Sequence, residues 1–196
     1  HQLETYPLSQ FIYIRSVFAL IILSFIAPWY GGFESIKTKQ WQWHFLRAVL
    51  SIIAMYGFFY GITKMPLVNT LTLVFIAPLI VTALSPTLLK EKVGWRRWIA
   101  VILGFIGVLI ILRPGNGTFS LASLSVVASA FAYALLAITA RKLASTESTI
   151  AMSVYVLVGP LIASLFFLSN NYNPPTKSAW IIFSLAGVAS VGVWLG

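Results

Sequence analysis

The stretch LLKEKVGWRRWIAVILGFIGVLIILRPG, which runs from Leu88 to Gly115, joins a densely charged edge to a long rod without charge. Four cations and one acid lie between Lys90 and Trp98, whereas Ile99–Leu112 contains no charged residue. The tripeptide RPG that follows is typical of a turn. A lipid bilayer suits this pattern, because its headgroups attract cations and its hydrocarbon core accepts an apolar helix. The stretch therefore predicts a membrane-spanning helix with a cationic end.

The composition of the whole chain supports the same interpretation. Of its 196 residues, 59% are hydrophobic and 9% are charged, and the mean hydropathy is +0.92. A soluble domain has about 25% charged residues, so a water-covered surface cannot be built from this chain. The net charge of +9 would suit a nucleic-acid partner. The cations are scattered between apolar runs, however, and no nucleic-acid partner is predicted.

Seven segments are long and apolar enough for transmembrane helices, which need about 20 residues each. None of them alternates apolar and polar residues as the strands of a membrane barrel do. The predicted fold is therefore all-α, a polytopic bundle of transmembrane helices. The seven predicted spans are Leu8–Trp29, Trp43–Thr63, Pro66–Leu89, Trp95–Leu112, Thr118–Ala140, Thr149–Ser169 and Ser178–Gly196.

Lysine and arginine counts in alternate loops predict the orientation of the bundle, because cytoplasmic loops carry the excess. One set of loops and span edges, expected to face the cytoplasm, carries nine cations: Lys37, Lys39, Arg47, Lys90, Lys92, Arg96, Arg97, Arg141 and Lys142. The opposite set carries three, namely Lys64, Arg113 and Lys177.

A weak internal repeat relates two parts of the chain at an offset of 135 residues, the difference between positions 185 and 50. It aligns LSIIAMYGFFYG, Leu50–Gly61, with LAGVASVGVWLG, Leu185–Gly196, and superimposes a G-x-x-x-G motif in each. Small residues at this spacing let helices approach closely. An odd number of helices separates the copies, which predicts opposite orientations in the membrane, as in the inverted repeats of transporters.

Five motifs in order resemble the EamA family of the drug/metabolite transporter superfamily. They are LRA (Leu46–Ala48), YGITKMPL (Tyr60–Leu67), FIAPL (Phe75–Leu79), EKVGWRRW (Glu91–Trp98) and GFIGVLIILRPG (Gly104–Gly115). The resemblance covers residues 46–115 well and the rest loosely. Within the superfamily it is nearest to bacterial carriers of S-adenosylmethionine or riboflavin.

The resemblance implies ten helices in two inverted five-helix repeats, of which seven are visible here. Residues 1–115 would form a first EamA repeat without its first helix, and residues 116–196 the start of a second, truncated repeat. The complete reading frame is expected to encode one more helix before His1 and about two and a half more after Gly196.

Polar and aromatic residues inside the spans are the predicted substrate contacts, because their polar groups would lack hydrogen-bond partners in lipid and should turn inward. Tyr56 and Tyr60 share one helix face, and Asn69 and Thr72 share another. The resemblance adds Arg15, which matches an arginine common in the family's second helix. The predicted substrate-binding residues are Arg15, Tyr56, Tyr60, Asn69, Thr72, Tyr133 and Trp194.

Structural roles are the alternative for such side chains. Ser125 and Ser129 are expected to hold helices together. Arg15 and Arg47, near span ends, are expected to extend their heads to the lipid headgroups. Pro78 and Pro160 lie inside apolar spans and predict kinks, since each removes one backbone hydrogen bond.

No sequence motif indicates catalysis, a cofactor or a metal. The chain has no cysteine, and its two histidines, His1 and His44, are far apart. It contains neither a nucleotide-binding P-loop nor a zinc-hydrolase or serine-hydrolase motif. No carboxylate lies within a predicted span, so no proton relay is visible there. The chain is therefore expected not to be an enzyme and to need no cofactor.

The sequence favours a multi-pass carrier of the bacterial cytoplasmic membrane that moves a small organic metabolite by alternating access. An amino-acid-, S-adenosylmethionine- or riboflavin-like substrate would fit. The expected partners are that small molecule and the lipid bilayer, and homodimer formation is left open. A non-transporting membrane scaffold or assembly protein is the alternative, and an integral-membrane enzyme is a weaker third.

Overall fold

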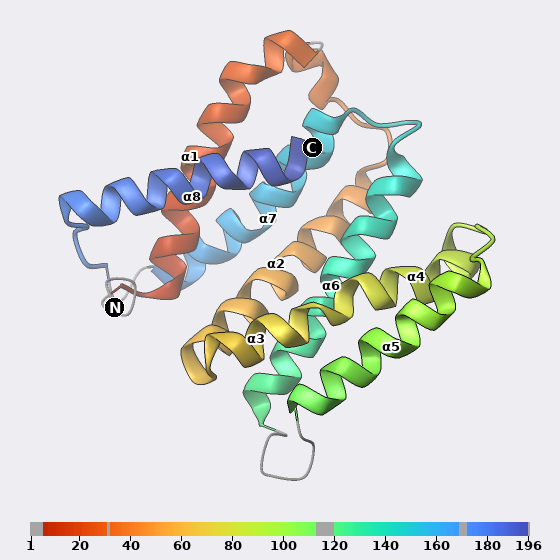
Figure 1. Ribbon diagram of the computed structural model, residues 1–196. Helices are drawn as coiled ribbons and strands as arrows, with labels where there is room; N and C mark the ends of the chain where they lie inside the picture. The colour runs from red at the N-terminus through yellow and green to blue at the C-terminus, as the bar shows by residue number, and fades with distance from the viewer. Residues whose placement is uncertain (1–5, 31, 113–119, 169–171, 196) are drawn as a thin grey trace. The chain divides into compact units, whose positions relative to one another are not determined.

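The computed structural model describes residues 6–30, 32–112, 120–168 and 172–195, and every regular element within these ranges is helical (Figure 1). This confirms the predicted all-α class for the described part of the chain. The helices are α1 (Leu8–Ile26), α2 (Trp41–Lys64), α3 (Leu67–Val74), α4 (Ile76–Leu88), α5 (Trp95–Leu112), α6 (Leu121–Leu143), α7 (Thr149–Leu168) and α8 (Lys177–Leu195), with the short 3₁₀ helices η1 (Ala27–Tyr30) and η2 (Phe33–Ile36).

Five stretches of the described residues are long and apolar enough to cross a membrane: Leu8–Trp29, Trp41–Lys64, Leu67–Leu88, Leu121–Leu143 and Thr149–Leu168. They match five of the seven predicted spans within a few residues at each end. A further apolar helix, Lys177–Gly192, is shorter within the described residues. Helix α5 forms over the whole predicted range, 18 residues. The chain is thus a multi-pass membrane protein.

Serine and threonine side chains cap the N-termini of three helices. Ser120 and Ser123 before and in α6 exchange hydrogen bonds between backbone N–H and hydroxyl, at 3.2 and 2.9 Å. The Ser148 hydroxyl accepts the N–H of Ala151 in the first turn of α7 at 2.9 Å. Thr176 does the same for α8. Such caps satisfy N–H groups that have no partner within the helix.

The third predicted span is a helix broken in two. Helix α3 ends at Val74 and α4 begins at Ile76, and Phe75 caps both helices. Pro78 lies in the first turn of α4. It has no N–H to donate to the carbonyl of Val74, and its ring crowds that carbonyl, so an unbroken helix is disfavoured at this point. In contrast, α7 continues through the buried Pro160.

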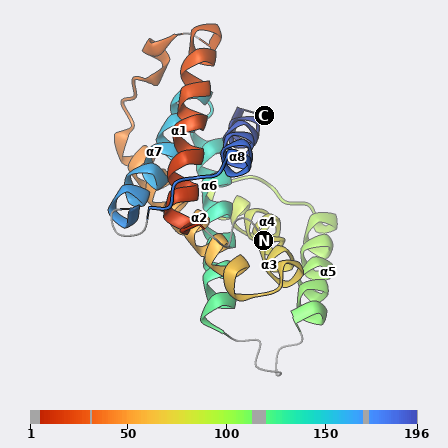
Figure 2. The ribbon, with the colours of Figure 1, turned by 90° about the vertical axis from the view of Figure 1, so that its left-hand side faces the viewer.

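The first compact unit comprises His1–Ile52 and Leu143–Gly196. Here α1 packs against both α7 and α8, and α7 also contacts α8 (Figures 1 and 2). The amide side chain of the buried Gln10 in α1 hydrogen-bonds both backbone groups of Asn173, just before α8. The core of the unit is apolar and consists of Ala19, Leu23, Ala27, Ile150, Leu157 and Val191.

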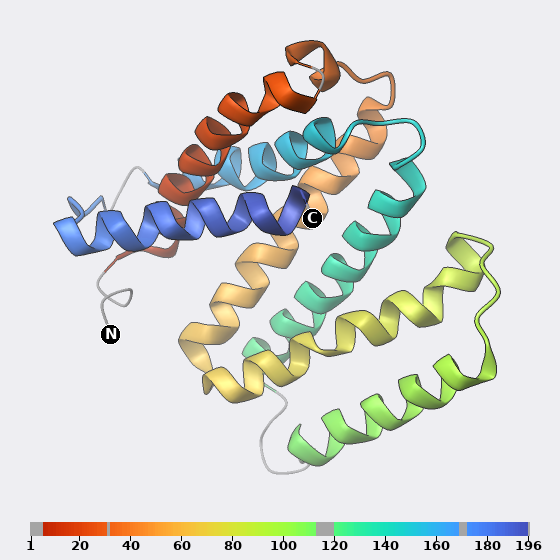
Figure 3. The same ribbon diagram turned by 45° about the horizontal axis from the view of Figure 1, so that its top comes forward.

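The second compact unit comprises Ile53–Lys142, in which the second half of α2 lies beside α6 (Figure 3). A Cβ added to Gly57 would lie 2.6 Å from the carbonyl oxygen of Ser125, and one added to Gly61 would clash with Cγ2 of Val126. Only glycine allows this approach, so the predicted close contact at this G-x-x-x-G motif is confirmed. At Gly192 of the second motif, a Cβ would meet nothing within 4 Å among the described residues.

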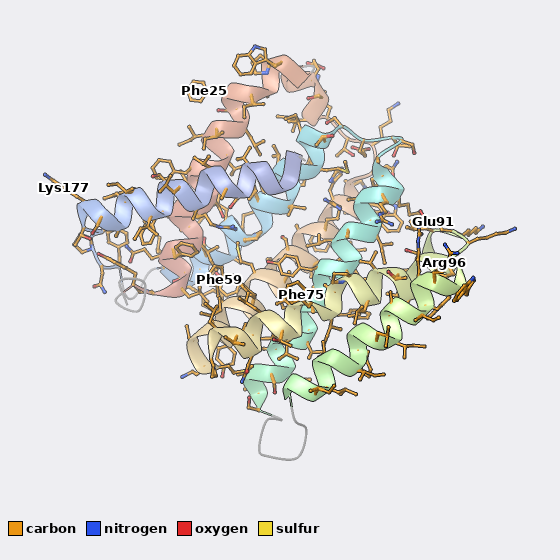
Figure 4. All side chains as sticks on the ribbon, in the orientation of Figure 1. Phe25, Phe59, Phe75, Glu91, Arg96 and Lys177 are labelled. Carbon is orange, nitrogen blue, oxygen red and sulfur yellow. The ribbon has the colours of Figure 1, made fainter. Side chains whose placement is uncertain are left out.

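A hairpin of α4 and α5 completes the second unit. A Cβ at Gly104 of α5 would lie 2.9 Å from Leu79 of α4, which shows how closely the two helices pack. The connection between them carries Glu91, which lies 3.8 Å from Arg141 at the end of α6. Figure 4 shows Glu91 and Arg96 at the same end of this hairpin. The cationic edge of the quoted stretch is therefore exposed, as predicted, at one end of two helices.

We predict that Gly159→Ala destabilises the protein by about 2 kcal/mol, because overpacking a close contact typically costs 1–3 kcal/mol. A Cβ at Gly159 in α7 would lie 2.7 Å from the carbonyl oxygen and 2.9 Å from the Cα of Ala48, and backbone atoms cannot move aside cheaply. Thermal unfolding of the detergent-solubilised protein measures the effect. Gly107→Ala is the matched control, since a Cβ there meets nothing within 4 Å. Equal unfolding temperatures for the two variants would contradict the contact.

Candidate functional site

Five of the predicted substrate contacts lie in the second compact unit, on three helices. Tyr56 and Tyr60 are half-buried on α2, and Tyr133 is half-buried on α6. Asn69 is half-buried on α3, one turn before the buried Thr72. The Thr72 hydroxyl donates to the carbonyl of Val68 at 2.8 Å. Three phenol rings and one amide thus lie on apolar helices of one unit, a composition typical of the walls of ligand pockets.

Two serines that sequence analysis assigned to helix packing do join helices. The Ser129 hydroxyl of α6 donates to the carbonyl of Ala54 in α2 at 2.6 Å. The Ser125 hydroxyl reaches the carbonyl of Gly57 at 3.3 Å and that of Ala122 in its own helix at 2.7 Å. The structural role predicted for both serines is confirmed.

Arg15 lies in the first compact unit, away in sequence from the tyrosines. It is half-buried on α1, and its Nη1 donates to the hydroxyl of Ser190 on α8 at 2.7 Å. The seventh predicted contact, Trp194, belongs to α8, but its side chain lies outside the described residues.

The expectation that Arg47 extends its head to the lipid headgroups is wrong. Its side chain is 1% exposed and is the largest of the fully buried side chains. The reason is its place on α2, where His44, Arg47, Ser51 and Ala54 follow each other at three- or four-residue spacing and are all buried. Residues at this spacing share one helix face. The buried face of α2 therefore begins polar and becomes small and apolar, a pattern that total hydropathy conceals.

The structure also brings together a pair that sequence analysis did not connect. The Nε2 of His44 in α2 lies 3.1 Å from Oε2 of Glu147, in the connection between α6 and α7, and the two side chains are 1% and 5% exposed. The His44 ring lies against the Tyr155 ring of α7, with centroids 4.4 Å apart. His44 and Glu147 are 103 residues apart, so no local sequence pattern connects them. The one sequence signal for His44 is its position on the same helix face as Arg47 and Ser51.

The neighbourhood of this pair is fixed by further hydrogen bonds within the first unit. The Gln40 amide, just before α2, donates to the Thr146 hydroxyl at 2.8 Å. The Ser148 hydroxyl donates to the carbonyl of Ser35 at 2.6 Å, and the Tyr155 hydroxyl to that of Ile36 at 3.4 Å. The start of α2, η2 and the start of α7 are thereby held against each other.

An apolar groove of about 590 Å³ runs between the first half of α2 and α7. Trp41, His44 and Tyr155 line one end, and Phe166 and Phe167 line the other. A smaller polar pocket in the second unit is lined by Ser85, Glu91, Arg97 and Arg141, among others. Within the described residues, no three histidine, aspartate or glutamate side chains gather as metal ligands would.

Comparison with known proteins identifies relatives. The EamA-like transporter family matches residues 1–113. A riboflavin transporter of Vibrio cholerae is 32% identical over 177 residues, which are 89% of this chain and 59% of the relative. An S-adenosylmethionine uptake transporter of Rickettsia bellii is 30% identical over 164 residues, 84% of this chain and 56% of the relative. No solved structure matches.

The chain thus spans less than two thirds of the length of these curated relatives. The family match covers more than half of the chain and includes the first four motifs of the resemblance and the fifth as far as residue 113. The chain belongs to the EamA-like transporter family.

Proposed function

We propose that the protein is a carrier of the bacterial cytoplasmic membrane that moves a small organic metabolite by alternating access. The observation that carries this proposal is the match of residues 1–113 to the EamA-like transporter family. The described part of the chain also contains five helices long and apolar enough to cross a membrane. Carriers of this kind need a binding site near the middle of the membrane and two states that expose it to either side. Two inverted five-helix repeats would supply such states.

The proposed substrate class is a flat heteroaromatic molecule with a polar tail. Two similar proteins are named for riboflavin and S-adenosylmethionine, which share this chemistry. The half-buried phenol rings of Tyr56, Tyr60 and Tyr133 support the same class, because aromatic side chains stack on planar ligands. Asn69 would add one amide to orient the polar part. Arg15 would hold a carboxylate if the substrate has one.

The two alternatives differ from a carrier in what they can do in a liposome. A scaffold would bind partners without moving a solute, and an enzyme would convert one. The similar proteins with assigned roles are named as transporters, which supports the carrier and speaks against an enzyme. Counterflow separates the three, because it requires movement of an unchanged solute in both directions.

We expect the protein encoded by the complete reading frame, reconstituted in liposomes loaded with unlabelled riboflavin or S-adenosylmethionine, to take up the same labelled compound transiently. Exchange through an alternating site produces this overshoot without an energy source. Protein-free liposomes and an excess of unlabelled compound outside are the controls. If neither compound nor a panel of amino acids produces an overshoot, the carrier proposal fails in favour of the scaffold.

The orientation is tested by single cysteines, for which the absence of native cysteine in this chain is convenient. Cysteines replacing Lys37, Lys92 and Lys142 should react with a membrane-impermeant maleimide only after the cytoplasmic side is opened. Cysteines replacing Lys64 and Asn173 should react in intact cells. The motive is the nine-to-three division of cations. Labelling of both groups from one side would refute the orientation and the inverted repeat.

For the substrate contacts, we expect Tyr60→Phe and Asn69→Leu each to weaken binding by about 1 kcal/mol, or about fivefold, the usual contribution of one hydrogen bond. Uptake normalised to the amount of protein in the membrane is the measurement, and that amount should not change. Leu103→Ala, at a 63% exposed position of α5, is the control that should leave uptake intact. Normal uptake by both polar variants would make these residues packing groups.

A further inference from the structure

We propose that His44 and Glu147 form the proton-binding site that couples transport to a pH gradient. This inference rests on the proposed function and adds a second ligand, a proton, at a place that no substrate contact occupies. Glu147 belongs to none of the predicted spans, because it lies between α6 and α7. The fold nevertheless buries it to 5% exposure against the imidazole of α2.

The hydrogen-bonding roles within the pair follow from the surroundings of Glu147. Glu147 directly precedes Ser148, the residue that caps α7 by accepting the N–H of Ala151. The N-terminus of a helix carries partial positive charge and stabilises an adjacent carboxylate. Because a carboxylate can only accept, we infer that Nε2 of His44 carries the hydrogen of the 3.1 Å hydrogen bond to Oε2. This hydrogen bond leaves the other ring nitrogen, Nδ1, with a lone pair.

A further feature of the pair is the second ring nitrogen of His44, Nδ1. It is buried and has no hydrogen-bond partner among the described residues. Its lone pair can accept a proton, which gives an imidazolium whose Nε2–H remains hydrogen-bonded to the carboxylate of Glu147. The proton comes from the aqueous phase and adds to Nδ1, and no other bond changes.

Groups of positive and of negative charge surround the His44 ring. The connection before α7 contributes the carboxylate of Glu147, and α7 contributes the phenol of Tyr155. One turn along α2 lies Arg47, whose side chain is also buried. On η2, Glu34 pairs with Lys37 at 2.6 Å in an exposed position. The imidazole therefore has groups of opposite charge in its neighbourhood, the carboxylate of Glu147 and the guanidinium of Arg47.

The pair lies at a contact between two helices. His44 meets Tyr155, and four residues along each helix Ala48 meets Gly159 so closely that a Cβ on Gly159 would lie 2.7 Å from a backbone oxygen. The backbones of α7 and of the first half of α2 are thus in direct contact, one turn from the His44 ring. A change of charge at His44 alters the energy of this contact, which is the requirement for a proton to favour one state of a carrier over another.

Transport by the complete protein in liposomes tests the coupling, with labelled riboflavin and S-adenosylmethionine as probes. A gradient of one pH unit, imposed in either direction, can drive about tenfold accumulation if one proton moves per substrate. We expect the wild type to accumulate a probe several-fold in one direction. His44→Gln and Glu147→Gln should lose this accumulation but keep counterflow. Glu34→Gln is the matched control, because it removes an exposed carboxylate of the same unit, and it should keep both.

Accumulation by His44→Gln and Glu147→Gln equal to that of the wild type would overturn the proton site while leaving the carrier intact. Absence of counterflow in the wild type would overturn the carrier instead. A second measurement judges the site independently of transport. In ¹⁵N-histidine-labelled protein, the His44 signal is identified as the one absent from the NMR spectrum of the His44→Gln variant. This signal should show a protonated Nε2 and an unprotonated Nδ1 at high pH, and two protonated nitrogens at low pH. A His44 signal that does not change between pH 5 and pH 9 would refute the proposal.

Discussion

Hydrocarbon offers no hydrogen-bond partner, and this constraint determines most of what the chain builds. Helices satisfy their own backbone, so the apolar segments become helices. Polar side chains within them must then find partners in the protein: the Thr72 hydroxyl bonds to its own helix, the Ser129 hydroxyl to α2, and Arg15 to Ser190. The helix ends follow the same rule, with serine or threonine caps before α6, α7 and α8.

Helix α2 carries two kinds of contact along its length. Its first half belongs to one compact unit and buries the polar side chains of His44, Arg47 and Ser51. Its second half belongs to the other unit and meets α6 through Gly57 and Gly61. One end of the helix is thus specified by charge and hydrogen bonding and the other by shape. A substitution in the first half should act mainly through an unsatisfied polar group, and one in the second through a steric clash.

The proposed carrier separates two chemical tasks by residue type. Aromatic and amide side chains of the second unit suit a planar metabolite. The histidine–glutamate pair of the first unit suits a proton and is buried beside an apolar groove. Each compact unit draws on both predicted repeats, since Ile53–Lys142 includes residues on either side of position 115. A proton and a metabolite at different places can influence each other only through the two states of the carrier.

The sequence by itself determined the helical class, most of the spans, the family and the packing roles of Ser125 and Ser129. These follow from local composition, from hydropathy and from motifs that lie within one or two helices. Tertiary structure alone decided that Arg47 is buried. An arginine near the end of a span can either reach the lipid headgroups or be buried, and only the packing of a neighbouring helix distinguishes the two. Tertiary structure also decided the break at Phe75 as opposed to the continuous α7 at Pro160, since proline is compatible with either. Above all it paired His44 with Glu147, 103 residues away, because a single hydrogen-bonded pair leaves no periodic pattern in the sequence.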